Sequence, residues 1–341
     1  MKKALIIGVT GQDGSLLARN LIDRGIEVHG TFRRGASDKF WRLSELGVRD
    51  RVHFHNYNVG NELAFSEIVK IADPDYIFSL AGESFTALSF EEPKHFMSIN
   101  IESAVEQLEA IRQFAPTARV FFAGSSEIFG EAPVDHKLNE DSKFHPKTPY
   151  GVSKLTQYYL VQLYREKYNL NLFSGILFPH ESPFRSPEFV TRKIVIGLAN
   201  RIYKDGPVLH LGDLSMQRDW GSAIDYVDWM FKLITQANAG DYIFGTGTNT
   251  SVETFLLAAA RFCGVTLEKK ETDTPGITNY IDSESGRIIA ESDVNKYGAN
   301  RFSYGAANSS KLMNAIGNPN VTDVIALAKI MVDAEVARAN K

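Results

Sequence analysis

The amino-acid sequence predicts an α/β protein with a doubly wound parallel sheet and a smaller C-terminal lobe. Over roughly the first 180 residues, short apolar runs alternate with longer amphipathic segments, the pattern of β-α-β units around a buried parallel sheet. The first apolar run leads directly into a glycine-rich turn, Gly8 to Gly14, which opens a helix near Ser15. Both observations are typical of an open sheet with helices on its two faces.

The strands of this sheet are expected in chain order where the apolar runs occur. Six runs qualify, at Lys3 to Ile7, Glu27 to Thr31, Val52 to His55, Asp75 to Leu80, Arg119 to Ala123 and Asn171 to Leu177. Helices should fill the gaps between them, because parallel strands need a long crossover connection. The segments Ser98 to Phe114 and Tyr150 to Tyr168 are predicted to be two of these helices.

The alternation of apolar runs and amphipathic segments becomes less regular after Phe178. Residues 1–178 are therefore expected to form the first domain. Residues 179–341 should form mainly the smaller lobe, with some segments returning to the first domain. Residues 268–304 are polar and without a period, and they predict loops and short strands. The other predicted elements are a loop at His180 to Pro187, a short strand at Val208 to Leu211, and helices near Arg192 to Lys204, Asp225 to Gln236, Val252 to Cys263 and Val321 to Ala339.

Composition excludes several classes of partner. Lys and Arg total 37 against 41 Asp and Glu, and no long basic run occurs, so neither nucleic acid nor an anionic membrane is an expected partner. Cys263 is the only cysteine, which excludes an intrachain disulfide. The N-terminus runs straight into a predicted strand and no apolar run approaches the roughly 18 to 20 residues of a membrane span. We expect a soluble cytoplasmic protein.

The glycine turn predicts a dinucleotide site. Glycines between a strand and a helix let backbone N–H groups and the helix N-terminus approach a pyrophosphate, although a tight turn without a ligand would show the same glycines. The second strand normally ends in a carboxylate when NAD is preferred, but here it leads into Arg33 and Arg34. Two guanidinium groups suit a 2'-phosphate, so we predict NADP; two solvated surface arginines are the plainer alternative.

A tyrosine and a lysine four residues apart predict redox chemistry at this site. On a helix, Tyr150 and Lys154 share one face about 6 Å apart, so the ammonium could stabilise the phenolate and make it a base near neutral pH. The same spacing occurs by chance on many helices. Ser125 and Glu127 follow the fifth predicted strand, at the end of the sheet where ligands bind, and Glu127 offers a second base unless it faces solvent.

With these residues in place, the chain resembles the extended short-chain dehydrogenase/reductase family, which has a Rossmann-type fold, and within it most closely the GDP-mannose 4,6-dehydratases. The resemblance rests on an ordered set of blocks: Gly8-Val-Thr-Gly-Gln-Asp-Gly14, Arg33-Arg34, Ser89-Phe-Glu-Glu-Pro93, Ser125-Ser-Glu-Ile-Phe-Gly130, Tyr150-Gly-Val-Ser-Lys154, His180-Glu-Ser-Pro183, Phe189-Val-Thr-Arg-Lys-Ile194, Arg218-Asp-Trp-Gly221 and Asp225-Tyr-Val227.

The resemblance implies a role for each matching residue. The catalytic set would be Ser125, Glu127, Tyr150 and Lys154, with Ser125 where the family usually has threonine. Contacts to the cofactor NADP would come from Gly8, Thr10, Gly11, Gln12, Asp13, Gly14, Arg33, Arg34, Asn58, Leu80, Ala81, Tyr150, Lys154 and His180. Contacts to a nucleotide sugar would come from Ser84, Ser126, Glu127, Glu181, Val190, Arg192, Lys193 and Arg218.

The implied reaction converts GDP-mannose to GDP-4-keto-6-deoxymannose by oxidation at C4, loss of water across C5 and C6, and return of the hydride to C6. Tyr150 would take the proton of the 4-hydroxyl while Ser125 holds that oxygen, and Glu127 would remove the C5 proton. Epimerases and 4-reductases of the same fold work with Ser, Tyr and Lys alone. Glu127 is therefore the residue that indicates a dehydratase.

Several positions depart from the family pattern, and they leave the substrate open. Pro179 replaces an asparagine, Phe184 and Arg185 weaken a double-arginine loop, and Gly298 and Arg301 stand where an arginine and a glutamate usually face the nucleotide ribose. The substrate is therefore GDP-mannose, a GDP-manno-heptose or another nucleotide sugar. A nucleotide-sugar 4-reductase or epimerase, and a dinucleotide-binding regulatory protein without turnover, remain as alternatives.

The sequence predicts no metal site. The pair His180-Glu181 lacks a second histidine four residues after the first, because Phe184 stands there, and the eight histidines show no ligand spacing. The resemblance implies a homodimer or homotetramer, since family members commonly form dimers or tetramers. A four-helix interface that uses the helices predicted at Ser98 to Phe114 and Tyr150 to Tyr168 would bury their outer faces.

Overall fold

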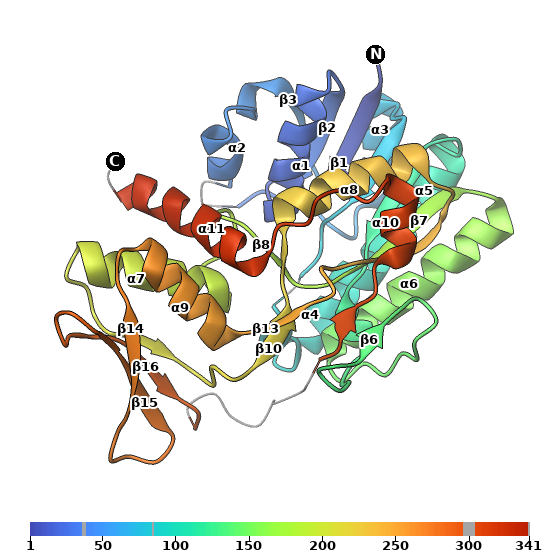
Figure 1. The fold of residues 1–341 in the computed structure, drawn as a ribbon. Helices are drawn as coiled ribbons and strands as arrows, with labels where there is room; N and C mark the ends of the chain where they lie inside the picture. Colours follow the sequence, from blue (N-terminus) through green and yellow to red (C-terminus); the bar gives the residue numbers. More distant parts are fainter. Residues whose placement is uncertain (36–38, 84, 296–303, 340–341) are drawn as a thin grey trace.

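A seven-stranded parallel sheet forms the centre of the protein (Figure 1). The computed structural model describes residues 1–35, 39–83, 85–295 and 304–339. The strands, in the order β12-β7-β5-β4-β1-β2-β3, are β12 (Gly240–Phe244), β7 (Asn171–Leu177), β5 (Arg119–Ala123), β4 (Tyr76–Ser79), β1 (Lys3–Ile7), β2 (Glu27–Phe32) and β3 (Val52–Asn56). The order reverses between β1 and β4, and open α/β sheets bind ligands at such a switch point. The predicted fold class is confirmed.

Alternation along the strands supplies two cores, one on each face of the sheet. On β1, Ala4 and Ile6 enter one core, whereas Leu5 and Ile7 enter the other, because successive side chains of a strand point to opposite faces. The helices that bury these faces are α1 (Gln12–Asp23), α2 (Trp41–Glu45), α8 (Ala223–Gln236) and α10 (Ser310–Ile316) on the first, and α3 (Glu62–Ala72), α5 (Ser103–Phe114) and α6 (Pro149–Tyr168) on the second.

The helices α6 and α1 begin in different ways, one with a side-chain cap and one without. The α6 helix starts at Pro149, with the Thr148 hydroxyl accepting a hydrogen bond of 2.9 Å from the Gly151 amide, so it carries a side-chain cap and an N-terminal proline. The α1 helix begins at Gln12 rather than near Ser15, and its first backbone N–H groups have no side-chain cap. Those amides therefore point toward whatever lies beside the glycine turn.

The helix predicted at residues 98–114 is not uniform. It follows α4 (Pro93–Met97), opens with a π-helical turn, Ser98–Glu102, and continues as α5. The π-helical turn carries Asn100, which is buried against α6 and donates a hydrogen bond of 2.9 Å to the Ser153 hydroxyl. π-helical turns inside helices are frequent at functional sites. This one contacts Ser153, the residue that precedes Lys154.

A separate core holds the smaller lobe together. Helices α7 (Val190–Tyr203), α9 (Val252–Phe262) and α11 (Val324–Ala339) pack beside a four-stranded sheet of order β14-β15-β16-β9 (Figure 1). Its strands are β14 (Leu267–Glu271), β15 (Ile277–Asp282), β16 (Ile288–Asp293) and β9 (Leu209–Leu211). The polar stretch predicted to be loops and short strands thus holds three strands of five to six residues.

The chain returns to the main sheet after entering the lobe. Strand β12 pairs in parallel with β7, and it adds a seventh strand to the six predicted from the sequence. Shorter pairs join the two parts: β8 (His180–Glu181) with β11 (Gly221–Ser222), β10 (Gln217–Asp219) with β13 (Asn249–Ser251), and β17 (Ala306–Ala307) with β6 (Lys137–Leu138). These short strands bring residues of the lobe to the end of the main sheet.

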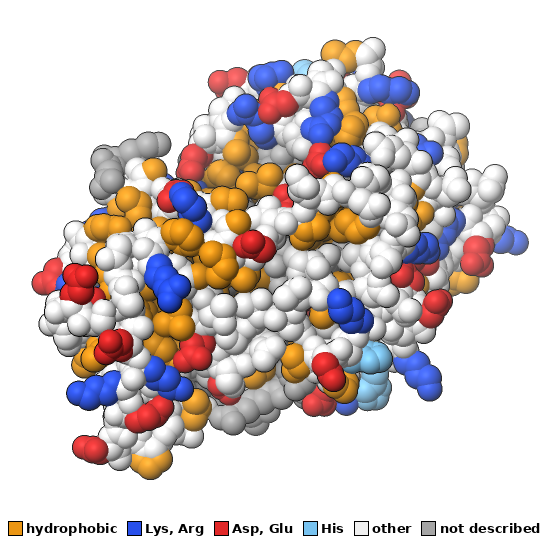
Figure 2. Space-filling model, in the orientation of Figure 1, with side chains coloured by type: hydrophobic (Ala, Val, Ile, Leu, Met, Phe, Trp, Pro, Cys, Tyr) orange, Lys and Arg blue, Asp and Glu red, His pale blue; other side chains and the backbone are white. Residues whose placement is uncertain are grey.

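The visible surface carries charges of both signs, interspersed over the face shown in Figure 2, with hydrophobic side chains gathered where α11 and α8 meet solvent. Such a mixed surface sets up no strong field of one sign on this face. No helix within the described residues is both long and apolar enough to cross a bilayer.

Candidate active site

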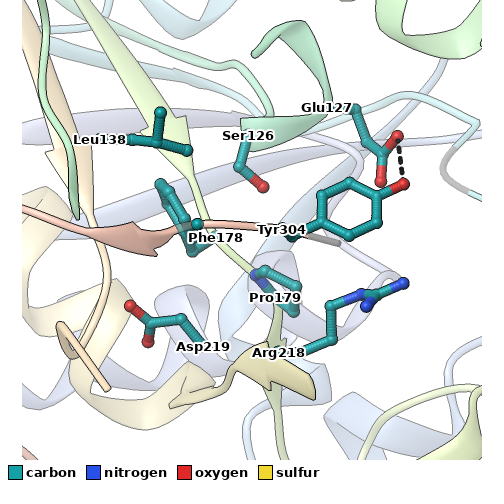
Figure 3. Close-up of a pocket in the computed structure, with 9 residues that line it drawn as sticks. Ser126, Glu127, Leu138, Phe178, Pro179, Arg218, Asp219 and Tyr304 are labelled. Atoms are coloured by element: carbon teal, nitrogen blue, oxygen red, sulfur yellow. Dashed lines mark hydrogen bonds between the residues drawn. The ribbon is translucent and has the colours of Figure 1, made fainter. Parts of the chain in front are cut away.

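A cleft of about 870 Å³ opens at the carboxyl ends of the central strands, between the main sheet and the lobe. Its walls include the glycine turn after β1, the segment after β5, the start of α6 and the segment from β8 to α7. A smaller pocket adjoins it beneath Glu127 and Tyr304 (Figure 3). The site is therefore assembled from segments far apart in the chain.

The glycine turn leaves no room for side chains. Gly8 has a φ of 90°, and a β-carbon on Gly14 would lie 2.2 Å from the carbonyl oxygen of Gly8. The absence of both β-carbons lets the backbone close tightly and leaves the uncapped N-terminus of α1 facing the cleft. These residues fit the pyrophosphate of a dinucleotide, for which the turn supplies backbone N–H groups.

An ion pair between His180 and Asp13 joins the glycine turn to the lobe. His180 Nδ1 donates to the Phe178 carbonyl at 2.8 Å, and Nε2 lies 2.9 Å from the Asp13 carboxylate. A ring that donates from Nδ1 must also carry a proton on Nε2 to face a carboxylate favourably. Burial lowers the pKa of His180, but Asp13 outweighs it and the net shift is upward. Burial likewise raises the pKa of Asp13, and His180 more than reverses this.

The pair predicts a pH-dependent contribution to stability. The pKa of His180 is raised from 6.5, so its contribution is complete below that pH and is lost as pH rises through the folded value. The pKa of Asp13 is lowered from 3.8, so its contribution is complete above that pH. We expect His180→Gln to lower the free energy of unfolding by about 3 kcal/mol or more at about pH 5.5, and by less in alkaline solution.

Urea unfolding at both pH values measures this effect. His210→Gln is a matched control, because His210 also pairs with a carboxylate, Glu291 at 3.0 Å, but lies exposed on the lobe. An equal loss of stability for His180→Gln at the two pH values would contradict the charged pair.

Ser125 and Tyr150 meet on one wall of the cleft. Ser125 follows β5, Tyr150 lies in the first turn of α6, and both side chains line the cleft. Burial raises the pKa of Tyr150 to about 12, even though the Ser125 hydroxyl lowers it. Burial thus opposes the phenolate near neutral pH that the helical spacing of Tyr150 and Lys154 predicts.

Lys154 lies one helical turn beyond Tyr150 and is buried. Its ammonium donates to the Ala123 carbonyl at 2.9 Å and to the Gln157 amide oxygen at 3.0 Å. Burial lowers the pKa of Lys154 to about 8, so near neutral pH it remains mostly protonated. Both bonds hold the amine at the end of β5, beside the cleft.

Glu127 is surrounded by groups that control its proton. It follows Ser125 in a short 3₁₀ turn, Ser126–Ile128, and lies partly buried beside Arg218 and Tyr304 (Figure 3). The Tyr304 hydroxyl donates to a carboxylate oxygen at 3.4 Å, and the Arg218 guanidinium lies 4.0 Å from the centre of the Tyr304 ring. Burial raises the pKa of Glu127, and Arg218 partly offsets the rise. A carboxylate so placed accepts a proton readily.

The structure brings most of the predicted site residues to this cleft. Those that line it are Gly8, Gly11, Gln12, Asp13, Gly14, Leu80, Ser125, Ser126, Glu127, Tyr150, Lys154, His180, Glu181, Val190 and Arg218. Those that lie elsewhere among the described residues are Thr10, Arg33, Arg34, Asn58, Ala81, Arg192 and Lys193. Ser84, Gly298 and Arg301 fall outside the described residues.

Arg192 is placed differently from the expectation for a diphosphate ligand. Its guanidinium is buried and pairs with Glu335 of α11 at 2.6 Å. Burial lowers the pKa of Arg192, and Glu335 partly offsets this. In the structure, this arginine therefore joins α7 to α11 within the lobe.

Arg33 and Arg34 are exposed at the end of β2, and the Lys39 ammonium donates to the Arg33 carbonyl at 3.1 Å. Asn58 is exposed after β3.

Two cleft residues were missed by sequence reasoning. Arg42, on α2, donates to the carbonyls of Thr10 at 3.2 Å and Phe184 at 2.7 Å, so it joins the glycine turn to the lobe. Tyr304 enters from the far end of the chain. Neither belongs to a local motif, and no signal in the sequence would have identified them. Within the described part of the chain, no group of three or more His, Cys, Asp or Glu side chains is arranged to hold a metal ion.

Comparison with known sequences gives a consistent result. The profile of a family described as GDP-mannose 4,6 dehydratase matches residues 5–331. A GDP-mannose 4,6-dehydratase of Sinorhizobium fredii is 35% identical over 340 residues, 97% of this chain and 95% of that protein. A protein of the same name from Vibrio cholerae is 36% identical over 305 residues, 86% of this chain and 81% of its own length.

Solved structures share the fold at lower sequence identity. A UDP-glucose 4-epimerase of Thermotoga maritima, solved with UDP-glucose, superposes with a TM-score of 0.80 at 20% identity, covering 99% of each chain. A dTDP-glucose 4,6-dehydratase of Bacillus anthracis, solved with NAD, gives a TM-score of 0.79 at 16% identity and covers 100% of this chain and 98% of its own. At these identities the likeness concerns the fold alone.

Proposed function

Because the chain belongs to the GDP-mannose 4,6-dehydratase family, we propose that it converts GDP-mannose to GDP-4-keto-6-deoxymannose. It is a nucleotide-sugar 4,6-dehydratase, and a nicotinamide dinucleotide is its cofactor. The observation that carries the proposal is the presence of Ser125, Glu127, Tyr150 and Lys154 around one cleft. Ser, Tyr and Lys suffice for oxidation at C4, whereas a second base is needed only for elimination.

The first step is proton removal from the sugar 4-hydroxyl. Tyr150 takes this proton in its phenolate form, and Ser125, on the same wall of the cleft, holds the same oxygen. Lys154, held by the Ala123 carbonyl, supplies a positive charge one helical turn away. A nicotinamide dinucleotide held at the glycine turn, Gly8 to Gly14, would supply the acceptor for the hydride of C4 and its donor to C6.

The second step is loss of water. A ketone at C4 acidifies the proton on C5, and Glu127 removes it, because burial has made this carboxylate more basic than an exposed one. Arg218 and Tyr304 lie beside Glu127 in the smaller pocket that adjoins the cleft (Figure 3). The hydroxyl group on C6 then leaves as water.

The two exposed arginines after β2 support a preference for NADP over NAD. Arg33 and Arg34 follow the strand whose end faces the adenosine ribose in this fold, and charge-assisted bonds to a phosphate contribute about 1.5 to 3 kcal/mol each. We expect NADP to bind at least about 10-fold more tightly than NAD in a direct calorimetric titration.

The double variant Arg33→Ala with Arg34→Ala should reduce the difference in affinity between NADP and NAD, because it weakens the binding of NADP alone. Arg261→Ala, at an exposed position on α9, is the control that should leave both affinities unchanged. NAD binding as tightly as NADP to the unaltered protein would refute the preference.

The identity of the sugar and of the base is tested with a panel of GDP, CDP, UDP and dTDP sugars. Mass spectrometry follows the loss of water, and NMR locates the ketone. The departures at Pro179 and Phe184 make GDP-manno-heptose an informative member of the panel, because both residues lie on the segment between β7 and α7 that faces the cleft. Simple inversion at C4, or net consumption of NADPH, would instead identify an epimerase or a 4-reductase.

We also propose a homodimer or homotetramer that pairs through α5 and α6. Several apolar side chains on these helices are solvent-exposed in the single chain, among them Val152 at 43%, Tyr159 at 48% and Leu163 at 60%. A four-helix contact with a second copy would bury them. Sedimentation equilibrium measures the mass, and a single-chain mass at micromolar concentration would contradict the proposal.

A further inference from the structure

Tyr304 lines the cleft, but the reaction proposed above gives it no role. Its hydroxyl group lies 3.4 Å from Glu127, and its ring covers the guanidinium of Arg218 (Figure 3). Tyr304, Glu127 and Tyr150 line the same cleft. A hydrogen-bonding hydroxyl group at this position touches the residue that handles the C5 proton.

The backbone around Tyr304 is fixed by side chains from three other segments. Its carbonyl accepts a hydrogen bond of 2.9 Å from the Asn249 amide. Three residues later, the Ala307 amide donates to the Asp219 carboxylate at 2.9 Å, and that buried carboxylate also accepts from the amides of Thr246 and Gly247. The chain is therefore held at the Tyr304 carbonyl and just after it, which keeps the phenol beside Glu127.

Both side chains are in the protonation states that proton transfer requires. Burial raises the pKa of Tyr304, and the charge of Glu127 raises it further, so the phenol keeps its proton. Burial also raises the pKa of Glu127, so this carboxylate accepts a proton from carbon more easily. The neutral phenol can donate to an oxygen that departs with negative charge.

The chemistry of the elimination calls for two groups that are close together. The proton leaves C5 and the oxygen leaves C6, on adjacent carbons, so the base and the acid must be neighbours. We propose that Tyr304 is a catalytic residue that gives its proton to the departing C6 oxygen and is reprotonated by Glu127. This deepens the proposed 4,6-dehydratase function and rests on it.

The step balances in protons and electrons. The C5–H bond breaks, its proton goes to Glu127, and its electron pair forms the C5=C6 double bond as the C6–O bond breaks. The departing oxygen takes the Tyr304 proton and leaves as water, and Glu127 passes the proton from C5 to the Tyr304 oxygen. Glu127 ends as a carboxylate and Tyr304 as a phenol, as they began.

Tyr304→Phe tests this role, because it removes only the hydroxyl group and keeps the ring over Arg218. The holoenzyme is incubated with GDP-mannose in D₂O. Without the acid, Glu127 returns a solvent-exchanged proton to C5, so recovered substrate should gain deuterium at C5 at close to the wild-type rate. Formation of the 4-keto-6-deoxy product should fall about 10²- to 10⁴-fold, which is the usual contribution of a positioned acid.

The ratio of C5 exchange to water loss is the decisive readout, since a loosened cleft would slow both processes together. Tyr280→Phe is the matched control: Tyr280 also donates to a carboxylate, Glu253 at 2.5 Å, but this pair lies in the lobe between β15 and α9. Tyr280→Phe should leave the ratio of C5 exchange to water loss unchanged. Thermal unfolding and NADP titration of both variants establish that each folds and binds the cofactor.

Three results would overturn the inference. An equal fall of exchange and water loss in Tyr304→Phe would indicate a loosened cleft and no acid role, and a fall in neither would show that Glu127 handles both protons without Tyr304. A wild-type enzyme that gives neither exchange nor water loss with any sugar nucleotide of the panel refutes the proposed function itself, and the role of Tyr304 with it.

Discussion

Glu127→Gln is expected to lower formation of the 4-keto-6-deoxy sugar about 10²- to 10⁴-fold while leaving oxidation at C4 intact. The amide keeps the size of the side chain but cannot take the C5 proton. Substrate should then reduce the bound nicotinamide in a single burst, which ultraviolet absorbance detects, and C5 should not exchange with D₂O. The variant therefore stops the reaction between its two proton transfers.

Glu131→Gln is the matched control for this variant. Glu131 lies four residues further along the chain and is exposed to solvent, so its substitution should change neither the burst nor the product. Product formation by Glu127→Gln at the wild-type rate would rule out Glu127 as the base.

Tyr150→Phe is expected to stop the reaction one step earlier. Loss of the phenol removes the group that takes the 4-hydroxyl proton, so product formation should fall about 10²- to 10⁴-fold with no burst of nicotinamide reduction and no C5 exchange. The ring still packs edge-on against Phe96, with ring centres 6.2 Å apart, so the fold should be retained. Stopped-flow absorbance distinguishes this pattern from that of Glu127→Gln.

The control for the tyrosine is Tyr203→Phe, an exposed position on α7. It should give a normal burst and normal product. A burst of wild-type size in Tyr150→Phe would show that another group takes the 4-hydroxyl proton.

The central sheet could be predicted from the sequence because its strands are apolar and buried on both faces. Leu5 and Ile6 are both fully buried although they point to opposite sides, and such runs stand out against amphipathic helices. Strand β12 was missed because it begins with Gly240 and Asp241, which leave an apolar run of only three residues. In the lobe, short strands were predicted but their bounds were not: β14 is Leu-Glu-Lys-Lys-Glu, which is largely exposed and has no apolar alternation.

The family resemblance identified Ser125, Glu127, Tyr150 and Lys154 as candidate catalytic residues. It could not predict properties that depend on contacts between residues far apart in the sequence. The pKa of Tyr150 is set by burial, which spacing on a helix does not reveal. Tyr304 reaches Glu127 across a sequence separation of 177 residues. Such contacts depend on the three-dimensional path of the chain, so a motif can identify one partner and leave the other unnamed.

The repeated return of the chain to the main sheet has a consequence for how the protein folds. Strand β12 forms the edge beside β7, and α8 buries the face that α1 leaves open, yet both come after the first segments of the lobe. A ribosome that has released only residues 1–178 has therefore produced a sheet that lacks an edge strand and part of its apolar cover. Completion of the first domain must wait for synthesis of the second, which links the two in one cooperative unit and leaves the nascent chain dependent on protection until α10 is made.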